Sequence, residues 1–420
     1  MRRRSFLRTL AAASAGGMLG VPRALAAVPK MKITRVRAYL PPKLNPSVDQ
    51  SNMVVTIETD AGVTGVGEGG GKDLIENCAI FLIGQNPFEI ERLWQLMYRG
   101  YFYPAGREKL HALGALDMAL WDLKGKALGL PVYELLGGLS RKYIECYAGG
   151  PDGSYRSSSG GGAGVNAPAM SLKERARATI EAGFRCFRIG AGDVRGTDTF
   201  NTHAIIPVIY AQCQEIREGV GKDGDWAIDM HTRFDLSDAI RLCTLLEPLA
   251  PYFIEDPLRS DSIDIYSSLR PQVKVPIAAG EQWGDRWDYS KLVENELLDY
   301  LRVTLPNVGG ITEYMKICAL AETHTVGLIP HFTGPISTVA LIHSAGTFSG
   351  PVLFEYDADN YEASHLPEWA EFKNGKWWFN ERPGLGVKFD PTKCRQIAEI
   401  TEPIVGRPEY YRPDGSFTNW

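Results

Sequence analysis

Three carboxylates recur at an equal interval, and each ends a short apolar run. They are Asp229 in WAIDMH, Glu255 in YFIEDP and Glu281 in PIAAGE, and both 255 − 229 and 281 − 255 equal 26. One strand–helix unit of a (β/α)8 barrel takes about 30 residues, so this interval predicts one acid at the carboxyl end of each of three successive strands. Oxygen ligands on a rigid rim suit Mg²⁺. A single such acid is more often a helix cap or a surface ion pair, but three at one interval favour a Mg²⁺ site.

Further polar residues end the neighbouring apolar runs: Arg188, His231, Thr304, His331 and Glu355. His231 follows the first acid by two positions, and residues two apart on a strand share a face, so it would lie beside the metal and could transfer a proton. His331, across the ring, is the second candidate acid or base. Arg188 could neutralise the acidic rim, bind a substrate oxyanion or lower the pKa of a neighbour.

From Tyr143 onward, apolar runs alternate strictly with helical patterns. The strand candidates are IECYA (144–148), CFRIG (186–190), AIDMH (227–231), YFIED (252–256), PIAAGE (276–281), YLRVTL (300–305), GLIPH (327–331) and VLFEY (352–356). Ser171 and Glu174 form a capping box at the start of the first intervening helix, and Gly183 ends it. Eight alternating units predict an α/β fold with a closed (β/α)8 TIM-like barrel rather than a doubly wound sheet.

The residues before the alternation predict a separate α+β domain. MKITRVRAYL, MVVTIETD and VTGVGE have strand patterns, and helical patterns follow at 73–83, 88–99 and 110–128. We therefore expect a capping domain over residues 28–142 and the barrel over 143–384. Residues 385–420 are expected to return and complete the capping domain. The Gly-rich segment 149–168 and the polar stretch GAGDVRGTDTFNTH are expected to be loops at the barrel mouth.

The first 27 residues differ from the rest in composition. The twin-arginine run Arg3-Arg4-Ser5-Phe6-Leu7-Arg8 precedes an apolar stretch from Leu10 to Val21, and Ala24-Leu25-Ala26 offers an A-x-A cleavage site. In this order these elements predict a twin-arginine export signal over residues 1–27 and a periplasmic mature chain. A disordered basic tail is the alternative.

Composition limits the remaining classes. At 420 residues the chain exceeds one typical core, so two domains are expected. The net charge of −5 and the lack of a basic block argue against nucleic acid as a partner. Beyond the signal, no apolar stretch is long enough to span a bilayer, so no membrane association is expected after its removal. The seven cysteines are scattered without C-x-x-C spacing, which is typical of small core residues rather than a disulfide framework or a zinc site.

With these features the chain resembles the enolase superfamily, in its mandelate racemase-like branch, from about residue 31 to 400. ALDMALWDLKGKALGLPVYELLGG (115–138) resembles the capping-domain helix, and the three spaced acids match the Mg²⁺ ligands. The D-x-H at 229–231, the R-I-G of strand 2, DYLRVTLPNVGGIT (299–312), His331 and Glu355 are most similar to the mannonate dehydratase group. The resemblance implies a dehydratase of sugar acids, in which Mg²⁺ stabilises the enediolate formed by loss of the α-proton and the 3-hydroxyl then leaves. It also implies a homo-oligomer, a dimer or an octamer.

The chain departs from this pattern around strand 2. The lysines of the branch's K-x-K align with Arg188 and Gly190, so the lysine base is absent. The tyrosine that works with the strand-2 arginine in the mannonate group aligns with Phe200, although Tyr210 or Tyr155 could take its place in space.

The resemblance also assigns roles at the other strand tips. Thr304 replaces the aspartate that usually partners the strand-7 histidine, as in the mannonate group. We expect Arg188, His231 and His331 to be catalytic, with the order of the two histidines open, and Thr304 and Glu355 to bind substrate.

Two rival functions follow from the same residues. An acid-sugar epimerase or racemase would need a base on each face of the substrate, and the missing strand-2 lysine disfavours it. A periplasmic sugar-acid binding protein would keep the metal site without turnover, and the substitutions at Gly190 and Phe200 leave that function open.

Overall fold

The computed structural model describes residues 29–42, 53–100, 102–103, 105–154, 170–191, 199–358, 363–405 and 411–418. The expected export signal, Tyr155 and most of the two loops expected at the barrel mouth lie outside the described residues. The fold below is that of the unit from Met31 onward.

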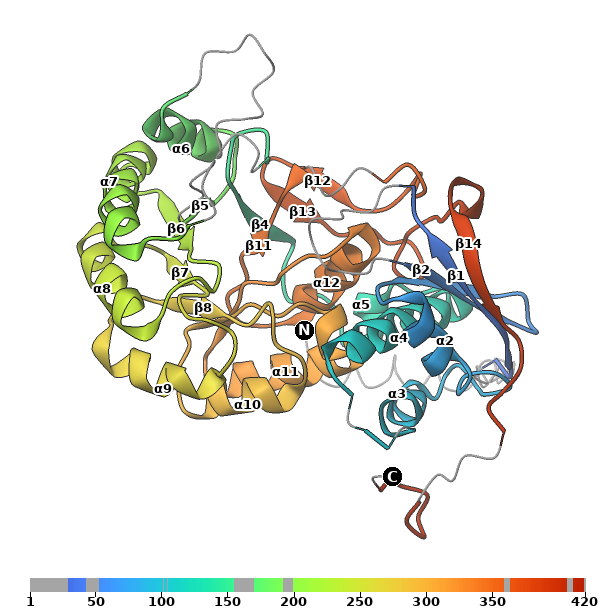
Figure 1. Cartoon of the computed structure of the whole chain (residues 1–420). Coiled ribbons are helices and arrows are strands. Elements are labelled where there is room, and N and C mark those ends of the chain that lie inside the picture. Colours follow the sequence, from blue (N-terminus) through green and yellow to red (C-terminus); the bar gives the residue numbers. More distant parts are fainter. Residues whose placement is uncertain are drawn as a thin grey trace, which may run out of the picture. The chain divides into compact units, whose positions relative to one another are not determined.

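A four-stranded antiparallel sheet combines the two ends of this unit. Its order is β14-β1-β2-β3, with bounds Arg395–Ile400, Ile33–Leu40, Val54–Thr59 and Thr64–Glu68 (Figure 1). The C-terminal strand β14 pairs with β1, for example at Val36 and Ile400. Residues 385–420, expected to return to the first part of the chain, therefore supply an edge strand of its sheet.

The helices that follow this sheet in the chain are α2 (Lys72–Ala79), α3 (Ile90–Arg99), α4 (Arg107–Leu128) and the short α5 (Val132–Leu135). Of these, α4 packs against β3 closely enough to exclude side chains at two positions. A Cβ atom on Gly65 or Gly67 of β3 would overlap carbonyl oxygens of α4, so glycine is required there. The predicted ranges 73–83, 88–99 and 110–128 match α2, α3 and α4, apart from a few residues at their ends.

The eight predicted barrel strands are all present and parallel. They are β4 (Tyr143–Ala148), β5 (Cys186–Gly190), β6 (Asp225–Asp229), β7 (Phe253–Glu255), β8 (Ile277–Ala279), β9 (Tyr300–Leu301), β10 (Gly327–Leu328) and β11 (Phe354–Glu355). They pair in chain order from β4 to β10, and β11 pairs with β4. A parallel bridge between Leu328 and Val352 links the β10 and β11 segments, and the Leu328 N–H donates to Pro351 O over 2.9 Å. These contacts complete the ring.

Helices surround the ring, and a β-hairpin pairs with one of its strands. The helices are α6 (Leu172–Glu181), α7 (Thr202–Val220), α8 (Leu236–Leu246), α9 (Tyr266–Leu269), α10 (Arg286–Glu294), α11 (Ile311–Thr323) and α12 (Pro335–Thr347). Ser171 and Glu174 form the predicted capping box of α6. The hairpin of β12 (Glu371–Lys373) and β13 (Lys376–Trp378) joins β4 in antiparallel fashion.

Several strands are shorter at their carboxyl ends than predicted. The strand β6 ends at Asp229, and His231 and Thr232 follow with left-handed φ angles of +51° and +58°. The prediction that His231 continues the strand beside Asp229 is therefore wrong. The strand ends at Asp229 because the carboxylate of this residue accepts the His231 N–H over 2.6 Å, and this hydrogen bond turns the chain. Likewise, Glu281, Thr304 and His331 stand beyond the ends of β8, β9 and β10.

One residue layer inside the barrel supports the strand ends. Its buried members are Tyr147, Cys186, Ala227, Phe253, Ala278, Ile329 and Leu353, from seven segments of the ring. Cys186, Ala227 and Phe253 precede Arg188, Asp229 and Glu255 by two positions, so each lies one step below a polar side chain on the same strand face.

The cysteines behave as predicted for core residues. None of the seven is paired, six are buried and Cys394 is partly buried. Within the described ranges, no helix has the length and apolar character needed to cross a membrane.

Candidate metal centre

The three predicted acids meet at the carboxyl end of the barrel. Asp229 and Glu255 are register partners on the parallel strands β6 and β7. Glu281 follows β8 after Gly280, and all three acids are buried, Glu255 completely. The His231 imidazole lies 3.9 Å from Oε1 of Glu281, and the His331 imidazole lies 3.6 Å from Oε2. The equal spacing in the sequence thus corresponds to a real gathering of side chains.

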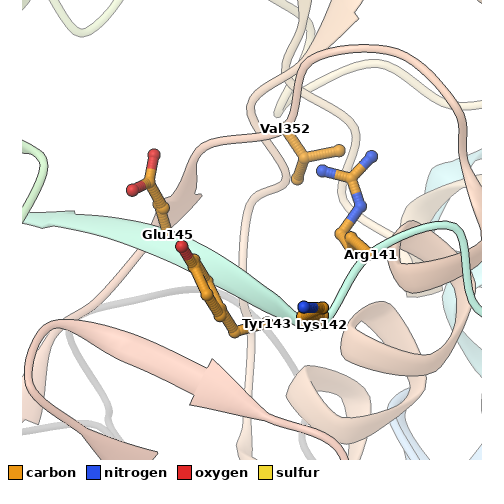
Figure 2. A pocket seen from close by; sticks show the side chains of 5 residues that line it. All are labelled: Arg141, Lys142, Tyr143, Glu145 and Val352. Atoms are coloured by element: carbon orange, nitrogen blue, oxygen red, sulfur yellow. The ribbon is translucent and has the colours of Figure 1, made fainter.

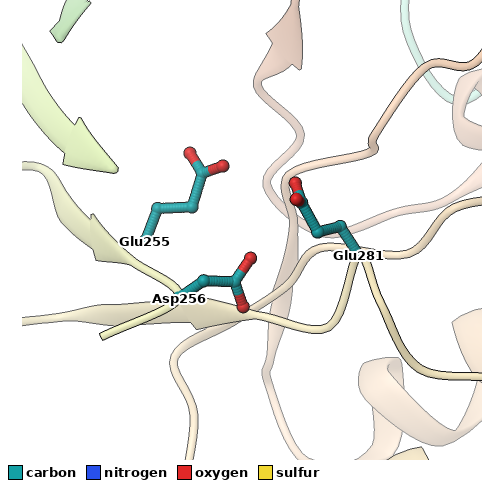
Figure 3. A group of neighbouring side chains, drawn as sticks. All are labelled: Glu255, Asp256 and Glu281. Atoms are coloured by element: carbon teal, nitrogen blue, oxygen red, sulfur yellow. The ribbon is translucent and has the colours of Figure 1, made fainter. Parts of the chain in front are cut away.

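The tightest group of acids, however, contains a residue that the sequence reasoning missed. Carboxylate oxygens of Glu255, Asp256 and Glu281 lie within 4.8 Å of one another, and Asp229 is not part of that group (Figure 3). Strand alternation would send Asp256 to the opposite face from Glu255. Instead β7 ends at Glu255 and Asp256 has a φ of +38°. The only sign of Asp256 in the sequence was its place as the second acid of the run EDP at 255–257.

Two buried arginines lie between the acids and pair with them, and the first is Arg188. The Nη2 atom of Arg188 lies 3.0 Å from Asp229, 3.1 Å from Glu255 and 3.2 Å from Glu355. Arg188 therefore contacts three acids of the rim, and the roles expected of it toward a substrate or a neighbouring pKa stay predictions.

The other arginine, Arg302, is fully buried beneath the rim. Its Nε atom lies 2.5 Å from Glu255 and 2.9 Å from Glu281, and its Nη2 atom pairs with Glu355. Its Nη1 donates to the Tyr147 hydroxyl over 2.7 Å. The sequence reasoning passed over Arg302 inside the run YLRVTL, although a charged residue in an apolar strand is itself a signal of a buried partner.

If all of its acids were ionised, the centre would hold more negative than positive charge. Five buried carboxylates surround the two guanidinium groups: Asp229, Glu255, Asp256, Glu281 and Glu355. Burial raises the pKa of Glu255 to about 8 and also raises the pKa values of Asp229 and Asp256. Burial acts against ionisation of Glu281 too, but His331 and Arg302 hold its pKa at about 2. A divalent cation would reduce this excess of negative charge, so the donor set fits a hard ion such as Mg²⁺.

The hydrogen bonds of Thr304 fix the tautomer of His331. The Thr304 hydroxyl donates to the Glu281 carbonyl over 2.9 Å, and it lies 3.0 Å from Nδ1 of His331. Since the hydroxyl has one hydrogen, Nδ1 must be the donor in the second bond. Burial lowers the pKa of His331, so its neutral form, protonated on Nδ1, presents a free Nε2 lone pair. This is the arrangement of a proton acceptor held in place by Thr304, and the predicted substrate contact of Thr304 stays a prediction.

The alternatives for a tyrosine base are not gathered at the centre. Phe200 is exposed, and its ring packs edge-on against Phe234, with ring centroids 5.2 Å apart. Tyr210 lies on α7 and packs into the helical layer, and Tyr155 lies outside the described residues.

Contacts from the N-terminal part fix the loops at this end of the barrel. Arg107 donates to the carbonyl of Gln282, next to Glu281, and Trp94 donates to Gly309 O over 2.7 Å. The Asp117 carboxylate accepts the Thr312 N–H over 3.0 Å at the start of α11. The helix α4 therefore rests on the segments that follow β8 and β9.

A hollow lies at the opposite end of the barrel, at the amino ends of β4 and β11. It has a volume of about 370 Å³ and is lined by Arg141, Lys142, Tyr143, Glu145 and Val352 (Figure 2). Arg141 there donates to Gly350 O over 2.7 Å. Active sites of such barrels occupy the carboxyl end, where the acids gather.

Comparison with known proteins agrees with this geometry. Residues 36–137 match the N-terminal domain of the mandelate racemase / muconate lactonizing enzyme family, and residues 171–393 match the enolase C-terminal domain-like family. A D-galactonate dehydratase of Pectobacterium atrosepticum is 32% identical, and one of Ralstonia pickettii is 33% identical. Each alignment covers 93% of this chain and 100% of the relative.

Solved structures show the same relationship. An enolase superfamily member from Salmonella Typhimurium has a TM-score of 0.79 at 26% identity, covering 88% of this chain and 100% of that one. An L-talarate dehydratase from Polaromonas sp. JS666, complexed with Mg and L-glucarate, has a TM-score of 0.72 at 27% identity, covering 89% and 99%. The chain therefore belongs to the enolase superfamily, in its mandelate racemase/muconate lactonizing enzyme branch of acid-sugar dehydratases.

Proposed function

We propose that this chain is a Mg²⁺-dependent hydro-lyase that dehydrates a sugar acid at the carboxyl end of its barrel. The observation that carries the proposal is the placement of two histidines at the two oxygens of one buried acid, Glu281. Dehydration needs a base for the α-proton and an acid for the departing 3-hydroxyl, and two separately placed imidazoles supply both.

In this proposal Asp229, Glu255 and Glu281 hold the Mg²⁺. The bound ion would offset the negative charge that develops on the substrate carboxylate as the α-proton leaves. Each of Arg188 and Arg302 contacts three carboxylates, so the two guanidinium groups offset part of the repulsion among the acids.

The two histidines take different steps. His331 accepts the α-proton at Nε2, because Thr304 retains the proton on Nδ1. His231, whose side chain is 52% exposed, exchanges protons with solvent and donates one to the departing hydroxyl. Glu355 stays paired with both arginines, at the edge of the substrate space.

Turnover should be tested with purified protein, Mg²⁺ and a panel of aldonic and uronic acids, beginning with D-galactonate, for which the two relatives above are named. We expect a 2-keto-3-deoxy acid. Deuterium exchange at the α-carbon without loss of water would replace the dehydratase with an epimerase. Binding of a sugar acid without either reaction would indicate a binding protein.

The metal requirement has its own test. The Glu255→Gln variant should lose turnover and bind Mg²⁺ more weakly, because it removes a buried ligand charge. Wild-type turnover in this variant would end the metal hypothesis.

We also propose that residues 1–27 export the folded chain to the periplasm and that the mature protein is a homo-oligomer. The buried, unpaired cysteines are compatible with folding before export. Replacing Arg3 and Arg4 with lysine should retain the protein in the cytoplasmic fraction, and unchanged export would refute the signal. Light scattering on the mature chain would give a dimer or an octamer, and a monomer would refute the assembly.

A further inference from the structure

We infer that Asp256 is a fourth acid of the metal centre and that its Oδ2 atom ligates the bound ion directly. The inference rests on the proposed function, because it concerns the ion proposed there. Asp256 is 3% exposed, and its carboxyl group faces the space between the ends of Glu255 and Glu281 (Figure 3). It belongs to the tight acidic group from which Asp229 is absent.

The two oxygens of Asp256 have different surroundings. Oδ1 accepts the Gly280 N–H over 3.2 Å. Among the buried acid oxygens that the structure describes at this centre, Oδ2 of Asp256 alone lacks a hydrogen-bond partner. A buried carboxylate oxygen without a partner costs about 1–3 kcal/mol or more, and a cation bound at Oδ2 would offset that cost.

Two of the other acids, Asp229 and Glu255, already have both oxygens engaged by the protein. Asp229 accepts the His231 N–H with Oδ1 and pairs with Arg188 through Oδ2. Both oxygens of Glu255 contact Arg188 or Arg302. Oδ2 of Asp256 is therefore available to a cation without breaking an existing contact.

The backbone holds Asp256 in this position. Its φ of +38° is unusual for a residue other than glycine, asparagine or aspartate. The Asp256 N–H donates to Ala278 O over 2.9 Å, and its carbonyl accepts the Thr232 N–H over 2.9 Å. These bonds tie the residue to the segments that carry His231 and Glu281.

The test compares Asp256→Asn with wild type by titrating Mn²⁺, followed by electron paramagnetic resonance, and by counting the waters on bound Mn²⁺. Asparagine has the same shape and tolerates the backbone angle, so the fold should persist, as circular dichroism would check. Asp261→Asn is the matched control, since it removes a charge from the same loop at a side chain that is 71% exposed.

We expect Asp256→Asn to weaken Mn²⁺ binding at least tenfold and to add one water to the ion, with Asp261→Asn unchanged. Wild-type affinity in Asp256→Asn would overturn the inference, as would weaker binding with an unchanged number of waters. If Asp256→Asn fails to fold, Asp256→Ser supplies the same comparison. The proposed function fails separately, if wild-type protein binds no Mn²⁺ or if Glu255→Gln keeps full turnover.

Discussion

The buried acid Glu68 should make the stability of this protein depend on pH in a way that one substitution removes. Glu68 ends β3 and is 1% exposed, and its Oε2 accepts the N–H groups of Ile336 and Ser337 over 2.9 and 3.0 Å. These groups belong to the first turn of α12, which follows His331. A Cβ atom on Gly334 would overlap the Glu68 carboxylate, which would then have to shift.

The size of the effect follows from the pKa of Glu68. Burial raises it from 4.5 to about 7, against the lowering effect of the helix N–H groups. Because the native state holds the proton more tightly than the unfolded state, the free energy of unfolding is highest below pH 4.5 and falls as the pH rises to 7. A shift of 7 − 4.5 = 2.5, at 1.36 kcal/mol for each pH unit, gives a loss of about 3 kcal/mol.

Glu68→Gln should abolish this contribution, since the amide does not titrate. Urea unfolding of wild type and variant, measured in parallel from pH 4.5 to 8, isolates the contribution of Glu68. All other groups titrate in both proteins, so their effects cancel in the difference. We expect the wild type to lose about 3 kcal/mol relative to Glu68→Gln over this range. The exposed Glu181→Gln serves as the control. A difference between wild type and Glu68→Gln that stays constant with pH, or grows in the opposite direction, would refute the reasoning.

Three further substitutions test the site and its support. His331→Asn should reduce turnover by at least about a hundredfold while Mn²⁺ binding persists, and surviving turnover would make His331 structural. Thr304→Val should lower kcat about tenfold or more with little change in KM, and it should move the pH profile of kcat. Thr304→Ser should keep the wild-type kcat and pH profile, because serine retains the hydroxyl. Equal kinetics for the valine and serine variants would contradict the assigned tautomer of His331. Gly67→Ala should lower the free energy of unfolding by about 1–3 kcal/mol in urea, because its methyl group would meet the Ala115 carbonyl, and an unchanged value would contradict the packing.

The sequence alone predicted those site residues that recur once in each successive strand. Asp229 and Glu255 are register partners, so an equal spacing along the chain became proximity in space. The eight strands were likewise recognisable from their apolar runs. The pattern overestimated their length, since local turns such as the one at His231 end the pairing early.

The missed residues are those whose position depends on backbone angles or on partners distant in the chain. Asp256 required a left-handed φ that no pattern of polarity reveals. Arg302 finds its partners Tyr147 and Glu355 on strands far away in the sequence. Such pairings depend on how the ring closes. The alternation of strands and helices predicts a closed ring but not which side chains meet inside it.

The strand from the far end of the chain imposes an order on biosynthesis. The nascent β1 emerges from the ribosome early, yet its edge partner β14 begins only at Arg395. At about 5–20 residues per second, translation leaves that edge open for on the order of tens of seconds. The first sheet therefore cannot close until synthesis is nearly complete, and a chain truncated before β14 would expose a strand edge to neighbouring polypeptides.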